Sequence, residues 1–226
     1  MKTVVITGVS RGIGRALAER FLANGDFVIG SSRTGQVAFS HPNLAVFELE
    51  LTTASSRVAF AGSIQALGKK IDVFINNAGT WHDDDEGPVV DVEVLRQTLE
   101  VDLLGPIDVA EKLLPLMADG SHIVNVSSRR GSMSFTEERP DQAPGLSMVY
   151  PAYSIAKAGL NMFTRKLAVR LNGKTVVSSV HPGSVKTEMN PEGKISPKEA
   201  AEDLFVLACS SPETGQFWWK GEKFPW

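Results

Sequence analysis

Short runs of aliphatic and β-branched residues alternate along the chain with longer segments in which apolar residues recur at helical spacing. The short runs predict strands, and the longer segments predict helices. The predicted strands cover 3–7, 27–31, 44–49, 73–76, 122–126, 175–181 and 215–219. The predicted helices cover 13–24, 53–67, 91–118, 150–171 and 197–209.

Several of the predicted strands are apolar at nearly every position, which is typical of parallel strands covered on both faces. Strands that alternate with helices favour right-handed βαβ units. The pattern therefore predicts an α/β fold, namely a doubly wound (Rossmann) parallel seven-stranded sheet with helices on both faces, in a single domain over 1–226. Ligands of such sheets bind beyond the carboxyl ends of the strands, so the residues that follow each strand are the candidates for function.

Composition narrows the classes of function. Hydrophobic residues make up 42% of the 226 positions and charged residues 22%, as in ordinary globular proteins. The net charge of −3 argues against a nucleic-acid-binding surface, and no apolar run approaches the roughly 20 residues that span a bilayer. The strand pattern begins at Thr3, without room for a secretory signal, and the single Cys209 cannot form an internal disulfide or a zinc cluster. We therefore expect a cytoplasmic protein that binds no nucleic acid, membrane or metal.

A glycine-rich segment, TGVSRGIG at 7–14, joins the first predicted strand to the first predicted helix. Gly8 permits a tight turn, Gly12 lets the backbone approach a pyrophosphate, and Gly14 allows close packing of the helix against the strand. The amino terminus of the helix then faces the phosphates with unpaired N–H groups. The segment could serve only as a tight connection, but its place at the first βα turn favours a dinucleotide site that includes Ser10 and Ile13.

The end of the second predicted strand indicates which dinucleotide binds. An NAD site has an acidic residue there for the ribose 2′-hydroxyl, whereas this strand runs through Ser32 into Arg33. Arg33, with Arg11 of the glycine turn and Ser32, could bind a 2′-phosphate, because a planar guanidinium donates two parallel hydrogen bonds. Alternatively, both arginines are solvated surface charges. The joint placement of the arginines and the missing acid predict NADP(H) as the cofactor.

A candidate proton-transfer site consists of Tyr153 and Lys157, one helical turn apart, and Ser128 at the end of the predicted strand 122–126. A tyrosine and a lysine at this spacing also occur by chance on helix surfaces. With the serine nearby, the Lys157 ammonium would lower the pKa of the Tyr153 phenol, which could then protonate a developing alkoxide. Ser128 could hydrogen-bond the same oxygen and orient the carbonyl.

Five motifs together resemble the short-chain dehydrogenase/reductase family. They are TGVSRGIG at 7–14, NNAG at 76–79, VNVSS at 124–128, YSIAK at 153–157 and HPGSVKT at 181–187. They follow the family's order and cover almost the whole chain. The tail at 215–226 looks like the C-factor and carbonyl-reductase branch of the family.

The resemblance implies a role for each matching residue. Tyr153 would be the acid/base, Lys157 would tune it and hold the nicotinamide ribose, and Ser128 would bind the substrate oxygen. The remaining cofactor contacts would come from the adenine-side segments and from the segment beside the nicotinamide. These residues are Glu50, Leu51, Asn77, Ala78, Gly79 and Val101 on the one side, and Pro182, Gly183, Val185 and Thr187 on the other.

Three departures from the family pattern matter. Asp102 replaces an asparagine that holds a water of the family's proton relay, so we expect the relay to be altered rather than absent. Glu50 stands where the family commonly has an aspartate at the adenine. The stretch from Ser128 to Tyr153 is longer than in the family's common form, and its extra segment 129–149 reads as a loop near the mouth of the site.

We therefore predict reversible hydride transfer between NADP(H) and a carbonyl or alcohol, run as reduction of an aldehyde or ketone. The short stretch between Thr187 and the last predicted helix suggests an open, permissive substrate pocket. The alternative is a cofactor-binding signalling or regulatory protein on the same fold, with little turnover. Asp102 favours this alternative, whereas the intact Ser128, Tyr153 and Lys157 favour the enzyme.

Other features are expected to be structural. The acidic run at 83–86 predicts a solvated loop rather than a metal site. His181 is expected to shape the turn that follows it, Cys209 to be a buried helical residue, and the tail tryptophans to pack around the last strand. Relatives in the family pair through the helices corresponding to 91–118 and 150–171, so the resemblance allows a homodimer, although the inserted loop at 129–149 lies close enough to interfere and the oligomeric state stays open.

Overall fold

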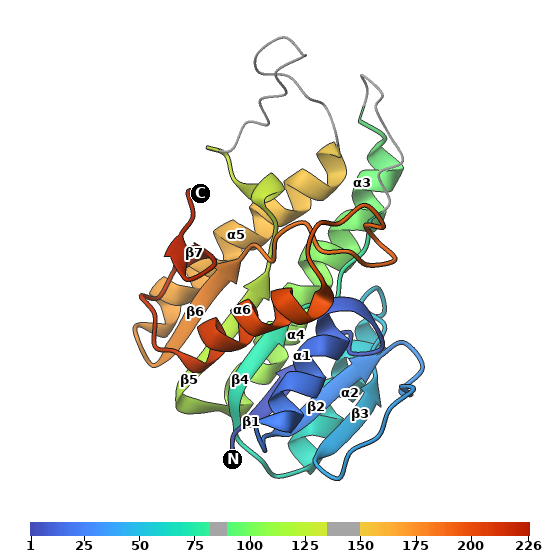
Figure 1. Ribbon diagram of the computed structural model, residues 1–226, viewed down its shortest axis with the longest axis vertical. Coiled ribbons are helices and arrows are strands. Elements are labelled where there is room, and N and C mark those ends of the chain that lie inside the picture. The colour runs from blue at the N-terminus through green and yellow to red at the C-terminus, as the bar shows by residue number, and fades with distance from the viewer. Residues whose placement is uncertain (82–89, 135–149) are drawn as a thin grey trace.

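The structure, a computed structural model, describes residues 1–81, 90–134 and 150–226 and contains, in these ranges, an eight-stranded sheet (Figure 1). The strand order is β3-β2-β1-β4-β5-β6-β7-β8. The strands are β1 Thr3–Ile6, β2 Phe27–Ser32, β3 Leu44–Glu48, β4 Ile71–Asn76, β5 Met117–Val126, β6 Thr175–Val180, β7 Gln216–Trp219 and β8 Glu222–Lys223. The first seven strands pair in parallel, as predicted. The predicted acidic loop at 83–86 and most of the predicted loop at 129–149 lie outside the described residues.

Helices cover both faces of the sheet. They are α1 Gly12–Ala23, α2 Ala54–Ala66, α3 Val92–Leu99, α4 Gly105–Leu113, α5 Pro151–Leu171 and α6 Pro197–Cys209. In Figure 1, α1 and α6 cross in front of the strands, and their side chains form one core, whereas α2, α4 and α5 contribute to the other. Val4 of β1 belongs to the first core and its neighbour Val5 to the second, which explains the apolar strands. No helix in the described part of the chain is long and apolar enough to cross a membrane.

The strand order reverses between β1 and β4, and this is the point where ligands of doubly wound sheets bind. A buried residue, Thr7, ties the two strand ends together. Its hydroxyl oxygen accepts hydrogen bonds from the backbone N–H groups of Asn77 and Ala78, each at 3.0 Å. The Asn77 side chain donates back to the Thr7 carbonyl at 2.9 Å. The glycine turn and the NNAG segment are therefore held side by side.

The prediction of one helix over 91–118 is wrong, because the segment is broken. After α3, residues Glu100–Leu104 form a π-helical turn, α4 follows, and Leu114–Leu116 form a 3₁₀ turn. Pro106 has no N–H group, so the regular helical bond to the Asp102 carbonyl cannot form. Pro115 acts in the same way at the end of α4, and β5 begins at Met117 rather than at the predicted 122.

The predicted sheet lacked β8, which pairs antiparallel with β7. The two strands are joined by Lys220 and Gly221, which both have positive φ values of 49° and 78°. Such a two-residue turn suits the twist of a hairpin, although lysine at its first position gives a weak sequence signal.

The tail tryptophans pack near this hairpin, as predicted: Trp226 stacks on Phe217 with ring centres 5.5 Å apart. Cys209 is the last residue of α6, so it is helical as predicted, but it is half-buried rather than buried.

Buried polar side chains fix α5 against the sheet. Asn76 of β4 donates to the Asn125 side chain of β5 at 3.1 Å, and Asn125 donates to the Thr164 hydroxyl of α5 at 2.9 Å. One helical turn away, Asn161 accepts from the Ser179 hydroxyl of β6 at 2.6 Å. Because such groups are costly to bury without partners, this network favours one position of α5 along the sheet.

Glycine at position 131 lets the segment after β5 touch α5. A Cβ added to Gly131 would lie 2.6 Å from the Lys157 carbonyl carbon, whereas a Cβ on Gly62 of α2 would meet nothing within 4 Å. We expect Gly131→Ala to lower the free energy of unfolding by about 1–3 kcal/mol, since backbone must move. The matched Gly62→Ala should raise it by about 0.5–1 kcal/mol. Urea unfolding of both variants measures this difference, and an unchanged midpoint for Gly131→Ala would show that the contact yields easily.

Candidate active site

A cavity of about 790 Å³ lies at the carboxyl ends of the strands. All residues predicted to bind the cofactor line it, together with Ser128, Tyr153 and Lys157. The predicted cofactor residues on its wall are Gly8, Ser10, Arg11, Gly12, Ile13, Gly14, Ser32, Arg33, Glu50, Leu51, Asn77, Ala78, Gly79, Val101, Pro182, Gly183, Val185 and Thr187. Asp102 does not line the cavity and is fully buried behind its wall.

The glycine turn has the shape that a dinucleotide requires. Gly8 and Gly12 have φ values of 75° and 58°, which glycine adopts readily and other residues do not. A Cβ on Gly14 would lie 2.1 Å from the Gly8 carbonyl oxygen, so the glycine lets the helix approach the turn. Within the described residues, no side chain caps the amino terminus of α1, and no acidic residue lies in its first turn. The helix therefore offers backbone N–H groups to an anion, which fits a pyrophosphate.

Both arginines predicted to meet a 2′-phosphate lie on the cavity wall. Arg33 is exposed in the turn after β2, and Arg11 forms an exposed ion pair with Glu188. The Ser32 hydroxyl donates its proton to the Gln36 carbonyl at 2.8 Å. Because that proton is directed to Gln36, any phosphate at this end would be attracted by the two guanidinium groups rather than by Ser32.

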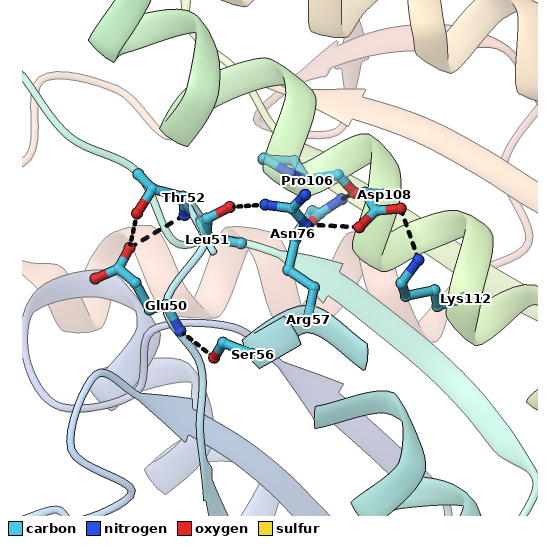
Figure 2. A network of polar contacts seen from close by, with 9 residues as sticks. All are labelled: Glu50, Leu51, Thr52, Ser56, Arg57, Asn76, Pro106, Asp108 and Lys112. Atoms are coloured by element: carbon cyan, nitrogen blue, oxygen red, sulfur yellow. Dashed lines mark hydrogen bonds and ion pairs between the residues drawn. The ribbon is translucent and has the colours of Figure 1, made fainter. Parts of the chain in front are cut away.

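The turn after β3, predicted to meet the adenine, is organised by Glu50 (Figure 2). One carboxylate oxygen of Glu50 accepts from the Thr52 N–H at 3.2 Å and from the Thr52 hydroxyl at 3.0 Å. The Glu50 N–H donates to the Ser56 hydroxyl at 2.9 Å. The longer glutamate, in place of the family's aspartate, thus folds back and stabilises its own turn.

Arg57 of α2 attaches this turn to α4 (Figure 2). Its guanidinium donates to the Leu51 carbonyl and, at 2.5 Å, to Asp108, which also accepts from Lys112 at 2.8 Å. Partial burial alone would raise the pKa of Asp108, but the hydrogen bonds from Lys112 and Arg57 hold that pKa below its usual value. The sequence pattern did not single out this support, although Asp108 and Lys112 have the i, i+4 spacing of a helix ion pair.

Ser128, Tyr153 and Lys157 meet where β5 ends and α5 begins, as predicted. Ser128 and Tyr153 both line the cavity, and the Lys157 ammonium lies 5.4 Å from the centre of the Tyr153 ring. Lys157 is 5% exposed, and its Nζ donates to the Val126 carbonyl at 3.3 Å. The wall of the cavity therefore carries two neighbouring O–H groups beside a buried positive charge.

Lys157 lowers the pKa of Tyr153, as predicted, but burial outweighs it and the pKa of the phenol lies above its ordinary value. Burial raises the pKa of the phenol and the Asp102 carboxylate raises it further, while Lys157, Ser128 and Arg130 lower it by less. For Lys157, burial lowers the pKa, but the neighbouring Asp102 and Tyr153 outweigh it, so that the pKa lies above its ordinary value. At neutral pH Tyr153 is therefore a protonated phenol and Lys157 an ammonium.

A sequence profile described as short chain dehydrogenase matches residues 2–197. The chain belongs to the short-chain dehydrogenase family. Members of this family are oxidoreductases that act on small molecules and use nicotinamide cofactors. The membership accounts for the motifs found in the sequence and for their convergence on one cavity.

Two relatives and one solved structure show how far the similarity extends. An uncharacterized short-chain type dehydrogenase/reductase of Sinorhizobium fredii is 32% identical over 199 residues, which are 84% of this chain but 34% of that protein. The trans-4-hydroxycyclohexanecarboxylate dehydrogenase of Sinomonas cyclohexanicum is 32% identical over 222 residues, covering 92% of this chain and 76% of that one. An NADPH-bound carbonyl reductase from chicken fatty liver matches with a TM-score of 0.86 and 25% identity, over 100% and 99% of the two chains. The predicted carbonyl-reductase-like branch is thereby confirmed.

In this short-chain dehydrogenase Asp102 forms a buried ion pair. Its Oδ1 lies 3.8 Å from Nζ of Lys157 and accepts a hydrogen bond from the Thr80 N–H at 2.9 Å. A Cβ on Gly79 would lie 2.7 Å from the same oxygen, so the last glycine of NNAG leaves room for the carboxylate. Asp102 belongs to the π-helical turn Glu100–Leu104, and such turns are frequent at functional sites.

The segment between β6 and α6 is short, as predicted, and folds back on itself. Lys186 N–H donates to the Ile195 carbonyl at 2.8 Å, and Ile195 N–H donates to the Ser184 carbonyl at 3.1 Å. A Cβ on Gly193 would lie 2.2 Å from the Lys186 nitrogen, so the two halves of this segment are in direct backbone contact. This compact hairpin holds Val185 on the cavity wall. The permissive substrate pocket stays a prediction.

His181 begins this segment and is buried. Its Nδ1 accepts a hydrogen bond from the Gly183 N–H at 3.3 Å, and its ring stacks on Trp219 with centres 5.9 Å apart. Burial, together with the nearby Arg129 charge, lowers the pKa of His181 to about 4. The imidazole is therefore neutral at neutral pH, in agreement with a structural role.

An aromatic cluster beside Tyr153 was not predicted. Trp81 stacks on the Tyr153 ring with centres 5.1 Å apart, and it meets Tyr150 edge to face at 4.3 Å. The Arg130 guanidinium lies 4.5 Å from the centre of the Tyr150 ring. All of these residues line the cavity. They follow no motif in the sequence, since Trp81 and Tyr150 come from distant segments.

The ion pair of Asp102 can be tested by two substitutions. Asp102→Leu should destabilise the fold by about 3–5 kcal/mol and lower turnover, because the Lys157 ammonium stays buried without its counter-charge. Asp102→Asn keeps an acceptor for Thr80 and should leave activity similar or higher. Since Asp102 raises the pKa of both Tyr153 and Lys157, the pH profile of Asp102→Asn should shift to lower pH.

Urea unfolding, and turnover against pH with one accepted ketone, measure these effects for wild type and both variants. Glu111→Gln serves as a control that removes a paired, partly exposed carboxylate of α4 that does not line the cavity. Wild-type stability and an unshifted profile in Asp102→Leu would show that position 102 has no part in the site.

Proposed function

We propose that this chain is an NADPH-dependent reductase of aldehydes or ketones. The observation that carries the proposal is the placement of Ser128 and Tyr153 with the buried Lys157 on the cavity that the glycine turn also lines. A site that only held a dinucleotide would have no need of two O–H groups beside a buried ammonium. The similarity to an NADPH-bound carbonyl reductase supports the same reaction class.

Reduction of a carbonyl adds a hydride to carbon and a proton to oxygen. NADPH, when bound, would supply the hydride. Ser128 would hydrogen-bond the carbonyl oxygen and hold it toward Tyr153. Tyr153, protonated at neutral pH because its pKa is raised, would donate its proton to the oxygen as negative charge develops there. Lys157 would stabilise the remaining phenolate, since its own raised pKa keeps it positively charged.

Residues of the site would also hold the nicotinamide and return the proton that Tyr153 donates. Lys157 would also bind the nicotinamide ribose, and Val185 would offer its N–H to the carboxamide. The Thr187 hydroxyl accepts from the Asn190 N–H at 3.2 Å, so its own proton is directed elsewhere and suits the carboxamide oxygen. Asp102 would act as a positioning residue, holding the water that returns a proton to Tyr153 through Lys157.

The preference for NADPH over NADH rests on the second strand. In the described part of the chain no acidic residue directly follows β2, and Arg33 and Arg11 line the cavity together with Glu188, which pairs with Arg11, and Glu50 of the turn after β3. Guanidinium groups match the paired oxygens of a 2′-phosphate. If Arg11 bound the phosphate, it would give up its ion pair with Glu188. That pair is exposed to solvent, so its loss would cost little free energy.

The alternative of a signalling protein with little turnover has no supporting observation in the described residues or the relatives. Asp102, which favoured it at first, forms an ion pair that keeps Lys157 charged and so suits catalysis equally well. Consumption of NADPH with a panel of aldehydes and ketones separates the two functions.

We also propose a homodimer in the cytoplasm. The helix α5 exposes Ile155, Met162 and Val169, which recur every two turns on one face. Exposed large apolar side chains on one helix face are typical of an association surface. The single free Cys209 suits a reducing compartment.

The choice of cofactor gives the first test. NADPH should bind at least tenfold more tightly than NADH, a difference of about 1.4 kcal/mol, because only NADPH carries the 2′-phosphate. Arg33→Ala should weaken NADPH far more than NADH, while the exposed Arg96→Ala on α3 serves as a control and should change neither. Fluorescence titration measures all affinities. Equal affinities of wild type for both cofactors would refute the cofactor choice.

Substitution of the proposed acid gives the second test. Tyr153→Phe should abolish nearly all turnover and leave NADPH affinity within a few-fold, because the phenol proton is lost while the ring remains. Lys157→Ala should reduce both, since Lys157 also holds the ribose. Steady-state turnover and NADPH titration measure these effects. Substantial activity in Tyr153→Phe would place the proton donor elsewhere.

A further inference from the structure

The proposed chemistry fixes where the rest of a substrate lies. Its oxygen must reach Ser128 and Tyr153, so the substituents of the carbonyl carbon occupy the adjoining part of the cavity. Trp81, Arg130 and Tyr150 line the cavity beside these two residues and have no role in the proposed hydride or proton transfer. They are therefore the side chains that a substituent would meet.

The three side chains form flat walls in fixed orientations. The Trp81 and Tyr153 ring planes are inclined by 26°, and those of Trp81 and Tyr150 by 68°. Offset-stacked and edge-to-face pairs are the favourable arrangements of aromatic rings. Arg130 lies over both other rings, 4.5 Å from the centre of Tyr150 and 6.0 Å from that of Trp81. Each ring is thus oriented by the next before any substrate binds.

Tyr150 has an unfavourable backbone conformation, which is typical of a residue at a ligand site. It has φ 62° and ψ 53°, a left-handed conformation that is unfavourable for a bulky residue. Tyr150 is followed by Pro151, the first residue of α5, so it cannot join the helix. Strained residues of this kind concentrate at ligand sites. In this backbone conformation the Tyr150 ring lies on the cavity wall, next to Trp81.

We propose that Trp81, Tyr150 and Arg130 form a subsite for an aryl group, so that the preferred substrates are aromatic aldehydes and ketones. The inference rests on the proposed function. A flat ring can stack on, or meet edge to face, the two rigid aromatic walls, whereas a puckered saturated ring of equal size makes only apolar contacts. A cation over a ring face is attracted by its π electrons, so Arg130 keeps the Tyr150 wall in place.

Two aldehydes of equal carbon number, benzaldehyde and cyclohexanecarbaldehyde, test the subsite. We expect Trp81→Leu to lower the ratio of their kcat/KM values, benzaldehyde over cyclohexanecarbaldehyde, about fivefold, mainly through the KM of benzaldehyde. The intrinsic reactivities of the aldehydes cancel when the variant is compared with wild type. Trp81→Phe should keep most of the ratio. Trp219→Leu, the same substitution at a tryptophan off the cavity wall, should leave it unchanged.

An unchanged ratio in Trp81→Leu would overturn the subsite while leaving the reductase function intact. Should Trp81→Leu not fold, or should neither aldehyde be reduced, calorimetric titration of wild type with NADPH bound decides. Benzamide and cyclohexanecarboxamide mimic the two aldehydes without reacting, and benzamide should bind about fivefold more tightly. Equal affinities of the two amides would overturn the subsite. Absence of turnover with every carbonyl compound would instead refute the proposed function.

Discussion

An ammonium group buried in a protein requires a nearby negative charge and hydrogen-bond acceptors, and Lys157 meets this requirement with Asp102 and the Val126 carbonyl. Several backbone features follow from that pair. Gly79 has no side chain where the Asp102 carboxylate lies, and Gly131 has none where the segment after β5 meets the Lys157 backbone. The site exists because β5, α5 and the π-helical turn approach one another closely enough to enclose the two charges.

The charges in and behind the cavity wall fall into two groups, one buried and one exposed to solvent. Lys157 and Asp102 are buried, so their interaction is little screened by salt and shifts the pKa of neighbouring groups. Arg11 and Arg33 are exposed, so they act through hydrogen-bond geometry and through attraction that salt weakens. The buried pair suits control of a proton, and the exposed arginines suit reversible capture of a phosphate.

The helical segment around α4 connects these two regions. Near its start, the Pro106 carbonyl accepts a hydrogen bond from Asn76 at 3.1 Å, and Asp108 accepts one from Arg57, which also holds the adenine-side turn (Figure 2). Asp102 precedes Pro106 by one turn. The segment therefore supplies β4 with a hydrogen-bond acceptor, the Pro106 carbonyl, and Lys157 with a buried carboxylate, that of Asp102.

The sequence by itself determined the order of strands and helices, the seven parallel strands and the place of the glycine turn at the carboxyl end of the first strand. These follow from local pattern, since a strand buried on both faces must be apolar throughout and parallel strands present their ends at one edge. The tertiary structure alone decided the break in the segment 91–118, the hairpin of β7 and β8, and the cluster of Trp81 with Tyr150. It also decided the direction of the Tyr153 pKa, because burial and the distance to Asp102 depend on packing between segments far apart in the chain.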